Sequence, residues 1–223
     1  MPANKNMLNI NNLLIGIPQE CVWEFLIFKA HQYSARVFIE TGTHLGNTAM
    51  NMALSGESAF DHIHTIEIDK EIFNSLSKIF TRQSEKIGID GAFNKIICHH
   101  GDSRKKLPEI LTDTNTRAIF WLDAHCSEGM TSSAADKDCV LLDELAMIKN
   151  HYIKEHVILI DDIDDVLRKK KGYPSLQEIV NGIYSINKDY AISMIYGILV
   201  AEIPSSMKYF GAVHKDNCPL EQL

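Results

Sequence analysis

The apolar residues of this chain fall into segments of two kinds, which alternate along most of its length. Short runs rich in β-branched and aliphatic residues have the length of buried strands, and they cover 36–39, 62–68, 95–100, 118–123 and 157–161. Longer segments with the apolar content of helices lie before and between them, namely Cys21–Tyr33, Lys70–Phe80, Lys105–Leu111, Cys139–Lys149 and Ser175–Ile186. Strands and helices that alternate in this way predict an α/β fold with a parallel sheet.

The alternation ends near the C-terminus. Ala191–Ile195 and Ile198–Ile203 are two short apolar runs joined by Tyr196-Gly197, which predicts an antiparallel hairpin. A length of 223 residues, with 45% hydrophobic and 23% charged residues, is typical of one globular domain. We therefore expect a single domain over residues 1–223, with a polar lead-in over 1–18.

Net charge and cysteine content indicate which kinds of partner and which cellular compartment suit this protein. The net charge of −7 argues against a nucleic-acid-binding protein, and we interpret the one basic run, Arg168–Lys171, as a solvated loop. The five cysteines form no C-x-x-C pair and no signal peptide precedes them, which indicates a reducing cytoplasm. No apolar stretch approaches the roughly 18 residues of a membrane span, so we expect a soluble protein without a membrane partner.

The first strand leads into a glycine turn, Arg36–Thr48 (RVFIETGTHLGNT), and then into a helix at Asn47. Glycine permits the positive φ of a tight turn and lets backbone N–H groups approach a ligand at the helix N-terminus. In a doubly wound sheet this position predicts a nucleotide-type ligand. The G-x-x-x-G spacing, with Glu40 two positions before Gly42, differs from the G-x-G-x-x-G of dinucleotide sites, so NAD fits poorly.

This segment resembles motif I of class I S-adenosylmethionine (SAM)-dependent methyltransferases. The resemblance implies that the acidic residue and the turn surround the methionine end of the cofactor. The cofactor-binding residues that we expect here are Glu40, Gly42, Thr43, Gly46 and Thr48.

Two further strand ends carry polar residues suited to a nucleoside. Glu67 ends the second strand about twenty residues beyond the glycine turn, the offset at which a carboxylate meets a ribose diol. Asp69 competes for this role, but it is better placed to cap the next helix. Asp102 and Ser103 follow the third strand, where either can accept a hydrogen bond from an adenine amino group and also cap the following helix.

Carboxylates also follow the fourth and fifth strands. Asp123 ends the fourth strand, and Asp161 and Asp162 end the fifth. Such groups at one sheet edge repel one another, and the repulsion is relieved by a divalent cation, by a raised carboxyl pKa or by a basic substrate. We favour a cation of the Mg²⁺ type, because Mg²⁺ prefers hard oxygen ligands.

Taken together, the motifs between Val37 and Asp162 resemble metal-dependent catechol O-methyltransferase-like enzymes. The resemblance implies a three-layer, Rossmann-like sandwich with a mostly parallel seven-stranded sheet in the order 3-2-1-4-5-7-6. It also implies Mg²⁺ on Asp123, Asp161 and Asp162, with Asp123 close to the cofactor as well.

The chain departs from the family pattern at two positions. Asp162 replaces the usual Asn, and Cys126 stands where the family has its catalytic Lys. His125 is the candidate that replaces the missing base, since an imidazole is a competent base near neutral pH, and it is equally suited to be a metal ligand.

We therefore expect a SAM-dependent enzyme that methylates a small hydroxylated acceptor with help from a divalent cation, with His125 and Asp123 as catalytic residues. A homodimer is a compatible assembly. The alternatives are an NAD-dependent oxidoreductase or epimerase on a similar fold, and a catalytically silent cofactor-binding protein.

Overall fold

We analysed a computed structural model of the chain. It describes residues 19–54, 59–123, 139–195 and 197–206. The predicted lead-in over 1–18 lies outside these residues, as do the predicted base His125 and its neighbour Cys126.

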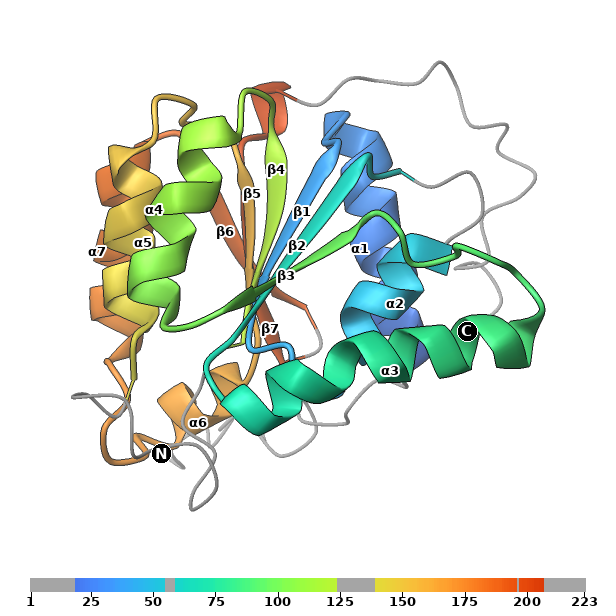
Figure 1. Ribbon diagram of the computed structural model, residues 1–223. Coiled ribbons are helices and arrows are strands. Elements are labelled where there is room, and N and C mark those ends of the chain that lie inside the picture. The colour runs from blue at the N-terminus through green and yellow to red at the C-terminus, as the bar shows by residue number, and fades with distance from the viewer. Residues whose placement is uncertain (1–18, 55–58, 124–138, 196, 207–223) are drawn as a thin grey trace, which may run out of the picture.

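A seven-stranded sheet forms the centre of the molecule (Figure 1). Its strands are β1 (Val37–Thr41), β2 (His62–Glu67), β3 (Ile96–His100), β4 (Ala118–Leu122), β5 (Val157–Ile160), β6 (Ala191–Ile195) and β7 (Ile198–Glu202). The order is β3-β2-β1-β4-β5-β7-β6, with β7 antiparallel to β5 and to β6 and the other pairs parallel. The predicted strand order and terminal hairpin are therefore confirmed.

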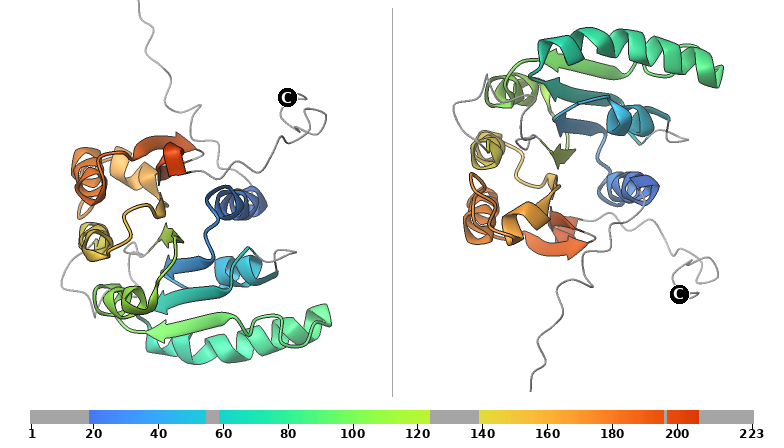
Figure 2. Two further views of the ribbon diagram at one scale, coloured as in Figure 1. Left: turned by 90° about the horizontal axis from the view of Figure 1, so that it is seen from above. Right: turned by 90° about the horizontal axis from the view of Figure 1, so that it is seen from below.

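Helices cover both faces of the sheet and complete three layers (Figure 2). One face carries α1 (Gln19–Tyr33), α2 (Asn47–Leu54) and α3 (Lys70–Ile87), and the other carries α4 (Ser103–Asp113), α5 (Leu141–Asn150) and α7 (Leu176–Ile186). Two apolar cores result, one centred on Phe38, Phe60 and Ile119 and the other on Leu107, Phe120 and Leu145. Successive residues of β1 and of β4 belong alternately to one core and to the other, because successive side chains of a strand point to opposite faces of the sheet.

The observed helices differ from the predicted ones at several places, of which three follow. Helix α3 runs to Ile87, seven residues beyond the predicted end, and stops where Gly88 adopts a left-handed conformation. Helix α4 begins at Ser103, because Asp102 is its N-cap. A short helix that we did not predict, α6 (Ile163–Leu167), follows β5.

Backbone register aligns the carboxyl ends of the parallel strands, at the lower edge of Figure 1. Gly42 N–H donates to the carbonyl oxygen of Ile66 in β2, and Asp123 N–H donates to that of Thr41 in β1. Asp161 N–H likewise donates to the carbonyl oxygen of Leu122 in β4. The residues that follow β1, β4 and β5 therefore form one row, next to the end of β2.

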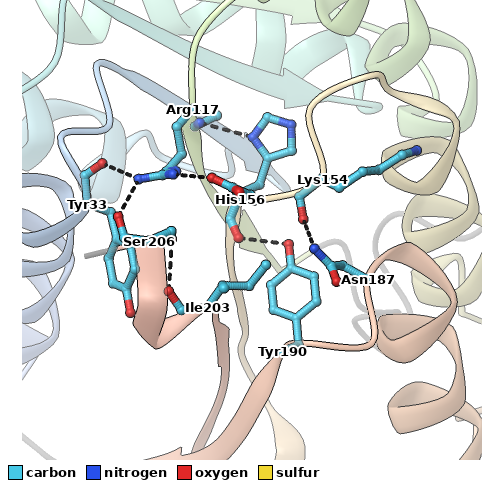
Figure 3. Close-up of polar contacts among 10 residues, drawn as sticks. Tyr33, Arg117, Lys154, His156, Asn187, Tyr190, Ile203 and Ser206 are labelled. Carbon is cyan, nitrogen blue, oxygen red and sulfur yellow. Dashed lines mark hydrogen bonds and ion pairs between the residues drawn. The ribbon is translucent and has the colours of Figure 1, made fainter. Parts of the chain in front are cut away.

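A network of polar contacts joins α1, β4 and the C-terminal strands at the opposite, amino edge of the sheet (Figure 3). The Arg117 guanidinium donates to the carbonyl oxygens of Tyr33 and Ser206, at 2.8 and 3.1 Å. The Tyr190 hydroxyl donates to the carbonyl oxygen of the fully buried His156 at 2.8 Å. These bonds tie distant segments together at the edge remote from the candidate site.

The structure bears on two of the expectations that we drew from composition. No helix in the described part of the chain is long and apolar enough to cross a membrane. Cys21, Cys98 and Cys139, the cysteines within that part, are free thiols.

Candidate functional site

The glycine turn connects β1 to α2 at the carboxyl edge. Gly42 and Gly46 have φ values of 88° and 75°, as the sequence predicted for a tight turn. Gly46 also lies against α3, since a Cβ atom added there would stand 2.7 Å from the Cε1 atom of Phe80. Glycine is thus required at position 46 for two separate reasons, its backbone conformation and its close packing.

Most of the turn's backbone N–H groups donate within the protein. Gly42 and Thr43 donate to the carbonyl oxygen of Ile66, and Gly46 donates to that of Thr43. The His44 N–H donates to Oε2 of Glu67 at 2.8 Å. These four N–H groups are therefore not available to a ligand. They hold the turn against β2 instead.

Glu40 is the most deeply buried carboxylate of the site, with 2% of the residue exposed. It lies within β1, one residue before the strand's end. The Thr65 hydroxyl donates to its Oε2 atom at 2.6 Å, and Thr43 bonds Thr65 in turn, also at 2.6 Å. Thr48 hydrogen-bonds Glu40 from α2. The predicted cofactor residues Thr43 and Thr48 therefore belong to a hydroxyl network around Glu40.

Burial is the main cause that raises the pKa of Glu40 to about 8. The charges of Asp123 and Glu67 act in the same direction, and the two threonine hydrogen bonds oppose it. Folding consequently takes up a proton between pH 4.5 and 8, so the contribution of Glu40 to stability falls as the pH rises through that window. At pH 7 the buried carboxyl group of Glu40 therefore lowers the free energy of unfolding.

We expect Glu40→Gln to increase the free energy of unfolding at pH 7 by about 1–3 kcal/mol, because an amide needs no proton to be buried. The gain should shrink towards pH 4.5, where the carboxyl group is protonated in both states. Chemical denaturation at several pH values measures it, with the exposed Glu24→Gln as the matched control. A variant that is less stable than the wild type at every pH would contradict the expectation.

Glu67, the predicted ribose ligand, is held from two sides. Its Oε2 atom accepts the His44 N–H and its Oε1 atom accepts the Asp69 N–H, each at 2.8 Å. With 4% of the residue exposed, it is not a solvated strand end. A carboxylate has about four acceptor positions, so each oxygen keeps one for a further donor, which suits the two hydroxyls of a diol. Asp69 caps α3 as predicted, accepting from the Glu71 and Ile72 N–H groups.

Asp102 and Ser103 lie where β3 joins α4. Asp102 caps α4 through the Arg104 N–H at 2.9 Å, and the Arg104 guanidinium contacts both of its carboxylate oxygens. Ser103 is buried and opens the helix. The predicted capping role of Asp102 is confirmed, and the adenine-binding role of the pair stays a prediction.

The three predicted metal ligands follow β4 and β5. Asp123 is half-buried. The Oδ1 atom of Asp161 accepts the backbone N–H of Asp162 at 2.8 Å. Asp162 is exposed and has a left-handed backbone with φ of 51°, a conformation that Asp and Asn tolerate better than most residues. Within the described ranges, no three His, Cys, Asp or Glu side chains are grouped so that they could hold a metal ion. The three residues thus follow neighbouring strands, but they do not fit an assembled three-ligand site.

Sequence reasoning missed two residues that shape this edge. Thr65 bridges Glu40 and Thr43, and it lies opposite Glu40 in the β1–β2 register. Arg104 contacts Asp102 from two residues away. The alternation of HIHTIEI, which places Thr65 on the same face as Glu67, was the signal that could have identified Thr65.

No protein-family model matches this chain, and no curated protein matches it in sequence. Solved structures do match the fold. The O-methyltransferase from Bacillus cereus, in complex with S-adenosylhomocysteine (SAH), has a TM-score of 0.56 at 15% identity, over 91% of this chain and 92% of that one.

Two further similar structures carry the same kind of ligand. The SAH-bound Podospora anserina methyltransferase PaMTH1 has a TM-score of 0.51 at 13% identity, over 91% of this chain and 97% of that one. The O-methyltransferase TomG from Streptomyces achromogenes, in complex with SAM, has a TM-score of 0.50 at 15% identity, over 82% of this chain and 79% of that one. The fold of this chain is therefore the class I SAM-dependent methyltransferase fold.

Proposed function

We propose that this protein is a SAM-dependent methyltransferase that transfers a methyl group to an oxygen of a small hydroxylated acceptor. The observation that carries the proposal is the acidic character of the carboxyl edge. Glu67, Asp102, Asp123 and Asp161 lie in the row of strand ends or directly after it. SAM carries a sulfonium and an ammonium group, so an acidic edge favours it electrostatically.

The same features argue against the dinucleotide alternative. A pyrophosphate is bound by free backbone N–H groups of the glycine turn, and the N–H groups of Gly42, Thr43, His44 and Gly46 already donate within the protein. The carboxylates near the turn would also repel the phosphates. These four N–H groups are thus not available to a pyrophosphate, and the charge of the edge disfavours NAD.

When bound, SAM supplies a methyl group that is activated by its positively charged sulfur. Transfer to an acceptor oxygen would release the hydroxyl proton, which a base of this protein would have to take up. Glu67 is suited to fix the ribose, and the Glu40 network holds the turn in place. His125 is our candidate for the base. Positioning and deprotonation are the main contributions that a protein can make to such a displacement.

Cofactor choice is the first test. Calorimetric titration of the full chain should give a micromolar-range dissociation constant for SAH and no binding of NAD. The reverse result would replace the methyltransferase proposal with the oxidoreductase alternative.

Turnover separates an enzyme from a silent cofactor-binding protein. The protein should transfer label from methyl-labelled SAM to at least one member of a panel of phenols, sugars and hydroxy acids. Binding of SAH without transfer to any of them would favour the silent alternative. The variant His125→Gln should lower kcat while leaving SAH affinity unchanged, if His125 takes the proton.

Assistance by a divalent cation is a separate proposal. Three carboxylates after β4 and β5 support it, but they are not assembled as a ligand group, and we assign the cation no step. Excess chelator should abolish turnover and added Mg²⁺ or Mn²⁺ should restore it. Full activity in chelator would remove the cation from the reaction.

Glu67→Gln is expected to weaken SAH binding by about 1.5–3 kcal/mol, the usual contribution of a hydrogen bond to a charged group. Glutamine is more informative than alanine here, because its amide oxygen can still accept one of the His44 and Asp69 N–H groups, whereas alanine would leave both without an acceptor. Calorimetry measures the change, with Glu71→Gln on the exposed side of α3 as the control. Unchanged affinity would show that Glu67 does not contact the ribose.

A further inference from the structure

Two histidines lie side by side on β2 and β3, near the end of the sheet that β3 closes (Figure 1). The Nδ1 atom of His64 lies 3.0 Å from the Nε2 atom of His99. The two rings are stacked, with their centroids 5.3 Å apart. Both residues are half-buried, so the pair is held in place by its surroundings and is still reached by solvent.

This histidine pair is separate from the candidate cofactor site. His64 and Thr65 are consecutive residues of β2, so their side chains point to opposite faces of the sheet. Thr65 hydrogen-bonds Glu40 on one face. The histidine pair shares the other face with Ile66, which belongs to the same apolar core as Leu107 of α4. The proposed methyl transfer uses neither ring.

The spacing of the two facing nitrogens suits a transition-metal ion. With metal–nitrogen bonds of about 2.0–2.1 Å, two imidazole nitrogens are about 3.3 Å apart on a tetrahedral ion and about 2.9 Å apart on a square-planar one. The 3.0 Å between Nδ1 of His64 and Nε2 of His99 lies within this range. Because β2 and β3 are neighbouring hydrogen-bonded strands, the pair is held on a rigid part of the fold.

The protonation of the rings also permits an ion to bind. Burial is the main cause that lowers the pKa of His64 to about 4, and burial likewise lowers the pKa of His99. Both rings are therefore neutral at pH 7, and one hydrogen bond joins them. The shared proton can move to the other nitrogen of its own ring, which leaves both facing nitrogens free to bind an ion.

The charged residues that act on the pair come from α4. Asp113 favours positive charge at His64, and Glu109 favours it at His99, whereas Lys106 opposes it at His99. Lys106 is itself paired with Glu109, at 2.8 Å between Nζ and Oε2. Its charge is thus offset by its partner, and the Asp113 carboxylate adds a favourable field for a divalent cation.

We propose that His64 and His99 form a two-histidine site for a divalent transition-metal ion such as Ni²⁺, Cu²⁺ or Zn²⁺. Imidazole nitrogens suit these ions, whereas Mg²⁺ prefers oxygen, so the site differs in metal class from the carboxylate site that we predicted after β4 and β5. The ring of His62 lies 6.3 Å from that of His64, and the three histidines are not grouped as a ligand set within the described residues. Water completes the coordination shell. The inference does not depend on the proposed function.

Calorimetric titration of the untagged full chain with Ni²⁺, in excess Mg²⁺, tests the proposal. Ni²⁺ is the probe because thiols, which this chain also contains, compete more strongly for Zn²⁺ and copper. The wild type should show a binding step that His64→Gln and His99→Gln each weaken by about 10–100-fold, since loss of a ligand should cost at least as much as loss of a residue that supports one.

His100→Gln is the matched control. His100 is the exposed neighbour of His99 on β3, and its ring contacts Phe73 of α3, on the opposite face of the sheet. This variant should keep the Ni²⁺ affinity within about twofold of the wild type. Ni²⁺ should also raise the melting temperature of the wild type and of His100→Gln, because only the folded site binds the ion. Melting curves without metal confirm that each variant is folded.

The double variant His64→Gln with His99→Gln should lose little more affinity than either single variant, because an ion held by both rings loses its site with the first. Absence of a Ni²⁺ binding step in the wild type would overturn the proposal. A step that survives in either single variant would also overturn it. So would an equal loss in His100→Gln, because it would show that the affinity does not come from this pair.

Discussion

Replacement of Gly46 by alanine is expected to cost the folded protein about 2–5 kcal/mol. A left-handed backbone costs a non-glycine residue about 1–3 kcal/mol, and forcing a methyl group into a packed core costs a similar amount. Both apply at Gly46, where φ is 75° and the new Cβ would stand 2.7 Å from Cε1 of Phe80. Chemical denaturation measures the loss, and SAH affinity should fall with it because the turn must shift.

Gly88→Ala separates the two contributions. Gly88 has a similar φ of 70°, at the end of α3, but nothing lies within 4 Å of its added Cβ. Gly88→Ala should therefore lower the free energy of unfolding only through the left-handed backbone, by about 1–2 kcal/mol. The second control is the double variant Gly46→Ala with Phe80→Leu, which should be more stable than the sum of the single effects predicts, since the smaller side chain relieves the clash. Equal costs at Gly46 and Gly88 would show that Phe80 does not constrain the turn.

The pair of buried histidines at the amino edge should make the protein sensitive to acid. The Ala118 N–H donates to Nδ1 of His156 at 3.1 Å, which places the His156 proton on Nε2. That proton points to Nδ1 of His151 at 2.8 Å, and His151 then donates from Nε2 to the Thr114 carbonyl oxygen at 2.9 Å. In this series of hydrogen bonds each ring nitrogen of His151 and His156 takes part once, which requires both rings to be neutral.

Burial is the main cause that lowers the pKa of His156 to about 3, and its neighbours His151, Arg117 and Lys154 act in the same direction. The unfolded chain takes up this proton below its ordinary pKa of 6.5, so the contribution of His156 to stability is lost as the pH falls from 6.5 towards 3. The expected slope is about 1.4 kcal/mol for each pH unit.

The difference in unfolding free energy between the wild type and His156→Asn isolates the contribution of His156. Other groups that titrate in the same range, such as His64, whose pKa burial lowers to about 4, contribute equally to both proteins. Asparagine can still accept the Ala118 N–H but does not titrate. The variant should be less stable at pH 7, and its deficit should shrink by about 1.4 kcal/mol per pH unit below 6.5. Exposed His31→Gln is the control and should leave the slope intact. A deficit that is constant from pH 7 to 4.5 would show that His156 does not titrate as proposed.

Local patterns along the chain predicted the fold well. The alternation of strands and helices, the terminal hairpin and the G-x-x-x-G turn all depend on residues close in sequence, and the structure confirms each of them. The strand order came from a family resemblance and is also confirmed. The short helix α6 was missed, because five residues are too few to show a helical period.

The candidate site was predicted only in part. Position along the chain placed Glu67, Asp102 and Asp123 at strand ends, because parallel strands end at one edge of a sheet. It did not reveal that Glu40 is sealed within a hydroxyl network, nor that Arg104 holds Asp102. It placed Asp123, Asp161 and Asp162 after neighbouring strands, but among the described residues they are not grouped as a metal site.

The sequence by itself thus determined which elements form and which residues end each strand, since hydrophobic period, glycine position and capping residues act over a few positions. Only the tertiary structure decided which side chains meet. Phe80 lies 34 positions from Gly46 and His151 lies 37 from Thr114, yet both pairs are in contact. Such contacts depend on strand register and helix packing across the whole sheet, which no short stretch of sequence contains.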